Sequence, residues 1–146
     1  MPTFPARVFL DANVIFSAAL SPAGNARALF ALAALRKTRL LTSRFAAEEA
    51  LRNILAKNPQ YIGEAETLLA SIAEVTEPSP AWLETARNNG VPSKDAPILG
   101  AAMAHRVEVL VTGDRSHFGH LYGVRIEGVL VVPPATAVGL LVKGLP

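Results

Sequence analysis

The chain contains three aspartates, and each stands where a carboxylate could take part in catalysis. Asp11 directly follows the apolar run RVFL, and Asp114 follows the run VEVLVT after a single glycine. Asp95 stands near the start of the apolar segment that leads into the second run. Oxygen ligands without cysteine select hard ions such as Mg²⁺ or Mn²⁺. Such ions activate water and stabilise charge on phosphoryl groups, so the aspartates indicate phosphoryl chemistry.

Alternating strands and helices must position these carboxylates. Apolar runs and β-branched residues predict strands, and 3.6-residue periodicity with capping residues predicts helices. This alternation is typical of a largely parallel sheet covered on both faces. We therefore expect one domain over residues 1–146, an α/β/α sandwich with a central parallel sheet. The predicted strands are 7–10, 38–42, 72–75, 107–112 and 129–132, and the predicted helices are 23–35, 45–56, 61–71, 80–89, 93–106 and 134–142.

In such a sheet the carboxyl ends of the strands form the ligand-binding edge. Asp11 and Asp114 follow two strands directly, so both are expected there. Asp95 is expected in the first turn of the helix 93–106, which begins on the same side. Glu48 and Glu49 open the helix that follows the second strand, again on that side.

Each acid also has a structural interpretation when considered alone. Asp11 could cap a following helix, Asp95 could interact with a helix dipole, and Asp114 could be a turn residue. Glu48 and Glu49 could belong to a solvated helix face. Two carboxylates about 5 Å apart repel by roughly 3 kcal/mol at an effective dielectric of about 20. Their convergence therefore favours either proton uptake or a bound cation.

Composition narrows the class of protein. Hydrophobic residues make up 51% and charged residues 18%, which excludes a disordered chain. The absence of cysteine excludes disulfides and thiolate metal sites and fits a reducing cytoplasm. The N-terminus does not have the pattern of a signal peptide, and the apolar segment 128–142 contains two prolines and is shorter than the about 20 residues that span a bilayer. We expect a cytoplasmic protein without a membrane segment, and its net charge of +2 is compatible with a polyanionic partner.

The acidic motifs together resemble the PIN-domain family, including the VapC-like toxins. The matching stretches are FLDANVIFSA, LLTSRFAAEEALRNIL and SKDAPILGAAMAHRVEVLVTGDRSHFG, in the order and spacing of the family. The resemblance implies an α/β/α fold and an endoribonuclease that uses Mg²⁺ or Mn²⁺. A metal-activated water would attack the RNA phosphodiester, leaving a 5′-phosphate and a 3′-hydroxyl.

The resemblance also implies roles for individual residues. Asn13 and Thr112 would be supporting polar groups. Glu49 is preferred to Glu48 because it is followed by a small residue and, five positions later, by Ile54. After Asp114 the sequence departs from many relatives, which carry a further acid where Ser116 and His117 stand here. The implied catalytic and metal-binding residues are Asp11, Glu49, Asp95 and Asp114, and the basic residues nearest to them, which we expect to contact RNA, are Arg44, Lys94 and Arg115.

Partners and alternatives follow from the same resemblance. The apolar segments ALFALAAL and AVGLLVKGLP suggest a homodimer, and the toxin analogy suggests an antitoxin partner. The alternatives are an RNA-processing nuclease outside a toxin system and a PIN-like binding scaffold without activity. A phosphatase of the haloacid-dehalogenase type is disfavoured because Asn13 cannot transfer a proton as its second aspartate does. His117 is expected to be a surface or packing histidine.

Overall fold

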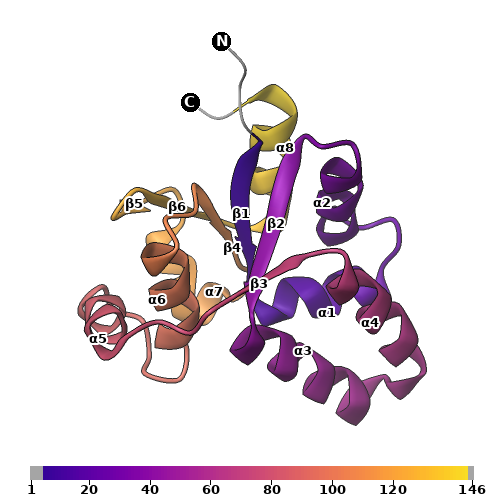
Figure 1. Ribbon diagram of the computed structural model, residues 1–146, viewed down its shortest axis with the longest axis horizontal. Coiled ribbons are helices and arrows are strands. Elements are labelled where there is room, and N and C mark those ends of the chain that lie inside the picture. Colours follow the sequence, from indigo (N-terminus) through magenta and orange to yellow (C-terminus); the bar gives the residue numbers. More distant parts are fainter. Residues whose placement is uncertain (1–4, 145–146) are drawn as a thin grey trace.

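The predicted strands pair into one sheet in the computed structural model, which describes residues 5–144. The strand order is β3-β2-β1-β4-β6-β5, and the pairs from β3 to β6 are parallel while β5 runs antiparallel to β6. Figure 1 shows β1 and β2 side by side at the centre of the molecule. The strands are β1 (Ala6–Leu10), β2 (Thr38–Ser43), β3 (Ala73–Val75), β4 (Val109–Val111), β5 (Arg125–Ile126) and β6 (Val129–Val132).

Helices cover both faces of the sheet because the strands are apolar on both faces. On β1, Val8 and Leu10 belong to the core beneath α1, α2, α4 and α8, whereas Phe9 belongs to the core beneath α5, α6 and α7. The two helical layers are visible on opposite sides of the strands in Figure 1. The helices are α1 (Ala12–Leu20), α2 (Asn25–Ala34), α3 (Arg44–Lys57), α4 (Ile62–Ala70), α5 (Pro80–Asn88), α6 (Ala96–Ala104), α7 (Arg115–Phe118) and α8 (Pro134–Lys143), with the short 3₁₀ turns η1 (Pro59–Tyr61) and η2 (Gly119–Leu121).

Strand β1 is the point at which the strand order reverses. The chain moves from β1 to β2 and β3 on one side and later returns to place β4, β6 and β5 on the other. Such a reversal opens a crevice beyond the carboxyl ends of the strands. The backbone N–H of Asp11 donates to the carbonyl of Val111 at 3.0 Å, which holds the ends of β1 and β4 together at this crevice.

The α/β/α class and the mostly parallel sheet are confirmed, and several boundaries differ from the prediction. Helix α6 begins at Ala96 rather than at residue 93, because Pro97 has no backbone N–H and is tolerated only in the first turn. Asp95 therefore precedes the helix. Sequence analysis gave no bounds to α1, whose residues ANVIFSAAL are apolar on most sides and have little periodicity. It also missed α7 and β5, which have four and two residues.

Within the described residues no helix is both long and apolar enough to cross a membrane. Residues 145–146 of the apolar segment AVGLLVKGLP lie outside the described residues, and its other residues belong to α8 and Gly144.

Candidate active site at the carboxyl edge of the sheet

Asp11 lies between β1 and α1, and three donors hold its carboxylate. Its side chain is buried, with 3% exposure. Oδ1 accepts the N–H of Ala12 at 2.7 Å, and Oδ2 accepts the hydroxyl of Thr112 at 2.8 Å and the amide of Asn13 at 3.0 Å. Asp11 thus caps α1 and also has a fixed orientation at the crevice, so its two interpretations from sequence apply together.

Asn13 and Thr112 connect Asp11 to the loop after β4. The side-chain carbonyl of Asn13 accepts the N–H of Gly113 at 2.7 Å, and the hydroxyl of Thr112 accepts the N–H of Asp114 at 3.2 Å. A Cβ atom on residue 113 would lie 3.3 Å from this Asn13 oxygen, so glycine permits the close approach. These bonds fix the position of Asp114 relative to Asp11.

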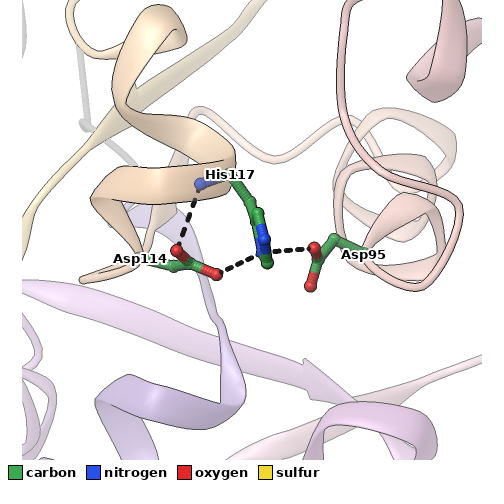
Figure 2. A group of neighbouring side chains, drawn as sticks. All are labelled: Asp95, Asp114 and His117. Atoms are coloured by element: carbon green, nitrogen blue, oxygen red, sulfur yellow. Dashed lines mark hydrogen bonds and ion pairs between the residues drawn. The ribbon is translucent and has the colours of Figure 1, made fainter.

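Asp95 and Asp114 lie on either side of His117, as Figure 2 shows. Asp114 caps α7, because its Oδ1 accepts the backbone N–H of His117 at 3.1 Å. The ring Nδ1 of His117 lies 2.8 Å from Oδ2 of Asp95 and 2.8 Å from Oδ2 of Asp114. The start of α6 and the start of α7 therefore bring two carboxylates and an imidazole to one point.

The α1 and α3 side of the site carries a different set of groups. Glu49, Asn53 and Lys57 are spaced four residues apart on α3, and all three face the same cavity as Phe16 of α1. The Lys57 ammonium lies 5.9 Å from the centroid of the Phe16 ring, within the range of a cation–π contact. Glu48 is exposed and accepts a hydrogen bond from Arg44 Nε at 3.0 Å.

These side chains enclose a cavity of about 260 Å³ beyond the ends of β1 and β4. Carboxylates reach it from the end of β1, from α3, from the start of α6 and from the start of α7. The lining residues are Asp11, Asn13, Phe16, Glu49, Asn53, Lys57, Lys94, Asp95, Asp114 and His117.

Burial and mutual repulsion raise the pKa of two of these acids. Burial raises the pKa of Asp11 from 3.8 to about 6, with further increases from the negative charges of Glu49 and Asp95, although hydrogen bonds from Thr112 and Ala12 act against the rise. Burial also raises the pKa of Asp95, and the charge of Asp114 adds to that rise, while His117 and Lys94 oppose it. The ionised site is thus electrostatically unfavourable without a positive charge.

The structure brings most of the residues predicted from sequence to this cavity. Asp11, Glu49, Asp95, Asp114, Asn13 and Lys94 line it, and Thr112 lies buried beneath it. Two predicted RNA-contacting residues lie elsewhere: Arg44 pairs with Glu48 and Arg115 is exposed, and neither lines the cavity. The sequence shows only that a basic residue is near an acid along the chain, not the direction of its side chain.

Sequence reasoning missed four lining residues. His117, expected as a surface or packing histidine, contacts two of the acids instead. Its position three residues after Asp114 was an available signal, because a helical turn places such residues on one face. The same logic applies to Asn53 and Lys57, which follow Glu49 at helical spacing. Phe16 gave no signal, because it lies in an apolar segment without clear periodicity.

The donor set fits a divalent cation. Asp95 Oδ2 and His117 Nδ1 are buried and lie 2.8 Å apart, and Nδ1 is equally close to Oδ2 of Asp114. Ligand atoms of Asp95, Asp114 and His117 lie within 4.8 Å of one another. Carboxylate oxygens are preferred ligands of Mg²⁺ and Mn²⁺, and the repulsion that raises the pKa of Asp11 and Asp95 would be relieved by such an ion.

A comparison with known families identifies this arrangement. The family model described as PIN domain matches residues 7–116. The chain belongs to the PIN domain family. The predicted resemblance is thereby confirmed, and the matched range includes all four acids of the cavity. No curated protein matches the chain.

Solved structures show the same fold. This PIN domain is similar to a protein of Pyrobaculum aerophilum, with a TM-score of 0.69 and 17% identity over 96% of this chain and 99% of that one. It is also similar to a chain of VapBC2 from Rickettsia felis, solved with a promoter DNA fragment, with a TM-score of 0.66 and 15% identity over 87% and 98% of the two chains. A third is VapC20 from Mycobacterium tuberculosis, a toxin that cleaves the sarcin-ricin loop, with a TM-score of 0.53 and 15% identity over 82% and 97%.

Proposed function

We propose that this PIN domain is a cytoplasmic endoribonuclease that hydrolyses RNA phosphodiester bonds with a divalent cation, Mg²⁺ or Mn²⁺. One observation carries the proposal: four carboxylates from distant segments line one cavity at the carboxyl edge of the sheet. Two of these acids have a raised pKa, which is the electrostatic mark of a site built to receive positive charge. The family match and the similarity to a toxin that cleaves the sarcin-ricin loop support this choice of substrate.

The proposed ligands of the cation are Asp11, Glu49, Asp95 and Asp114. A bound divalent ion lowers the pKa of water and offsets the charge that develops on a phosphoryl group. The role of the protein is to keep the carboxylates ionised, oriented and close together. Thr112 and Asn13 orient Asp11 through hydrogen bonds of 2.8 and 3.0 Å, in the manner of outer groups that position metal ligands.

Positive side chains at the cavity would bind the RNA backbone. Lys94 and Lys57 both line the cavity, so their ammonium groups can offset the phosphate charge beside the carboxylates. Arg115 is exposed next to Asp114 and would contact RNA outside the cavity. Arg44 would first have to leave Glu48, so we assign it a smaller contribution.

The toxin of a type II toxin–antitoxin pair is the biological role that we favour. Solved structures with this fold include a toxin-antitoxin complex from Klebsiella pneumoniae. In this chain α2 and α8 pack together, and Leu35 and Val142 near their ends are 69% and 68% exposed. These apolar groups support a homodimer or an antitoxin-bound state. Light scattering that finds a monomer at all concentrations would contradict the homodimer.

The nuclease proposal is tested by incubating the purified protein with mixed RNA. Cleavage is expected with Mn²⁺ or Mg²⁺ and is expected to stop when a chelator is added. The variant Asp11→Asn should not cut. A chain that leaves RNA intact under all conditions would favour the binding-scaffold alternative. An Asp11→Asn variant that cuts RNA as well as wild type would refute the proposed site.

The toxin proposal needs a separate test in living cells. Induced expression of wild type in a bacterial host should stop growth, and Asp11→Asn should not. A small open reading frame beside the gene is expected to encode the antitoxin, and co-expression of its product should restore growth. An active nuclease that leaves growth unchanged would instead favour an RNA-processing role.

A further inference from the structure

His117 occupies the centre of the half of the cavity formed by α6 and α7. Its Nδ1 atom lies 2.8 Å from one oxygen of Asp95 and 2.8 Å from one oxygen of Asp114. A ring nitrogen carries at most one proton, so it can satisfy at most one carboxylate by hydrogen bonding. The contact with the second carboxylate is then left without a proton between the two atoms. Three atoms that can each bind a metal ion thus converge at one point.

The spacing of these atoms matches that of adjacent ligands on a metal ion. Adjacent ligands at about 2.1 Å from an octahedral cation lie about 3 Å apart. The two nitrogen–oxygen distances of 2.8 Å are close to that value, and the three ligand atoms all lie within 4.8 Å of one another. Small side-chain shifts would therefore let all three atoms bind one ion.

The positions of the side chains are set by the backbone rather than by chance contact. The backbone N–H of His117 donates to Oδ1 of Asp114, which fixes α7 relative to this carboxylate and leaves Oδ2 directed at the ring. Asp95 approaches from the opposite side on the turn before α6, as Figure 2 shows. The imidazole is only 28% exposed, so it is held in this place rather than extended into solvent.

We propose that His117 is a direct nitrogen ligand of the cation, together with Asp95 and Asp114, and that it makes the site prefer Mn²⁺ to Mg²⁺. Mg²⁺ favours oxygen ligands and retains its waters, whereas imidazole is a ligand of first-row transition ions. This inference rests on the part of the proposed function that places a divalent ion at these carboxylates. It adds a ligand and a metal preference that the four carboxylates alone do not supply.

The competing explanation is that the positive charge of a protonated His117 takes the place of a metal ion. A protonated imidazole between two carboxylates would lower their repulsion and would have to leave when an ion binds. The two explanations predict opposite effects of removing the imidazole. Loss of a ligand weakens Mn²⁺ binding, while loss of a competing cation strengthens the binding of Mn²⁺ and Mg²⁺ alike.

The experiment uses the full chain with Mn²⁺ and pulsed electron paramagnetic resonance. Wild type is expected to show coupling between Mn²⁺ and a directly bound imidazole nitrogen, which changes on ¹⁵N-histidine labelling. The coupling should persist in His120→Gln and disappear in His117→Gln. His120 is a matched control, because it lies three residues away, and its ring Nε2 lies 2.9 Å from the carbonyl of Asn89 rather than near the acids.

Calorimetric titration supplies the second measurement. In His117→Gln the dissociation constant for Mn²⁺ should rise at least tenfold, while that for Mg²⁺ should change less than threefold. Absence of nitrogen coupling in wild type, or tighter binding of both ions by the variant, would overturn the proposal. RNA cleavage is measured on the same samples, so a protein that shows the coupling but does not cut would contradict the proposed function alone.

Discussion

The amino and carboxyl ends of the parallel strands differ in their polar groups: paired hydrogen-bonding groups lie at the amino ends, and crowded carboxylates lie at the carboxyl ends. At the amino ends of β1 and β2, Thr38 donates its hydroxyl to the carbonyl of Ala6 at 2.9 Å, and the Arg7 backbone N–H donates to Glu108. Each of these hydrogen-bond donors is thus paired with an acceptor on a neighbouring segment. At the carboxyl ends, four carboxylates share one cavity, and two of them have a raised pKa.

The two edges of the sheet therefore differ in role: the amino edge contributes to stability, and the carboxyl edge carries the candidate site. At the amino edge the Thr38 hydroxyl and the Arg7 backbone N–H are satisfied by partners within the protein, so these bonds contribute to folding. At the carboxyl edge, burial of the ionised carboxylates of Asp11 and Asp95 opposes folding, and Lys57 and Lys94 at the same cavity offset their charge only in part. Acids whose pKa is raised by burial and by neighbouring negative charge are typical of functional sites. Substitutions at the two edges should therefore have different effects on activity and stability.

Asp11→Asn should remove activity. The bound cation contributes several kcal/mol to the stability of the transition state, so loss of a central ligand should lower the rate of RNA cleavage by about 10³-fold. The measurement is the cleavage rate at saturating Mn²⁺. Asn at position 11 can still accept the N–H of Ala12, so the variant should remain folded. Circular dichroism checks the fold, and a loss of activity caused by unfolding would contradict this account.

The same pair of proteins should show a pH-dependent difference in stability without metal. The folded protein binds the Asp11 proton more tightly than the unfolded chain does, because burial raises the pKa from 3.8 to about 6. The free energy of unfolding that this group contributes is therefore greatest below pH 3.8 and decreases as the pH rises through 6. From pH 4 to pH 7 wild type should lose about 2 kcal/mol relative to Asp11→Asn. Urea unfolding in the presence of a chelator measures this, and equal pH profiles would contradict the buried, repelled carboxylate.

Thr112→Val should show whether the orientation of Asp11 affects RNA cleavage beyond any effect on the stability of the fold. The substitution removes the hydroxyl that donates to Asp11 at 2.8 Å, and such orienting groups typically contribute about tenfold to activity or metal affinity. Thr38→Val is the matched control at the amino edge, since it removes a buried hydroxyl that donates to Ala6. Both variants should lose about 1 kcal/mol of stability. A tenfold loss of cleavage in Thr38→Val as well would show that the effect is not specific to the site.

Lys57→Ala should weaken RNA binding by a few fold. Its ammonium lines the cavity, so its loss should raise the KM for RNA, leave kcat nearly unchanged and reduce the dependence of KM on salt concentration. Lys37→Ala is the control, because Lys37 is exposed just before the amino end of β2. Equal effects of the two substitutions would indicate that RNA binding depends on net charge and not on the cavity.

Much of the fold could be predicted from sequence because its signals are local. Apolar β-branched runs such as VFL and VLVV mark strands, and alternation with periodic helices sets a parallel sheet, which in turn places Asp11 and Asp114 at one edge. The bounds of helix α1 do not follow from the sequence, because it is buried on most sides and its apolar residues have little periodicity. Short elements such as β5, with two residues, are defined by pairing to β6 and carry no signal of their own.

The site could be predicted only in part, because some of its contacts depend on the packing of elements that are distant in the sequence. The acids were found because strand ends converge by topology, a rule that applies before any side chain is placed. The contact of His117 with Asp95 depends on how α6 and α7 pack, and these residues are far apart in the chain. The directions of Arg44 and Lys94 are likewise decided by their neighbours: Arg44 turns to Glu48, and Lys94 turns to the cavity.

The presence of a divalent ion among the carboxylates is tested most directly by anomalous diffraction from crystals soaked in Mn²⁺. The account predicts a strong peak inside the cavity, within about 2.5 Å of carboxylate oxygens of Asp95 and Asp114. That peak should be absent from crystals of Asp114→Asn soaked in the same way. An empty cavity in wild type at a Mn²⁺ concentration that supports RNA cleavage, or a peak only elsewhere on the protein, would contradict it.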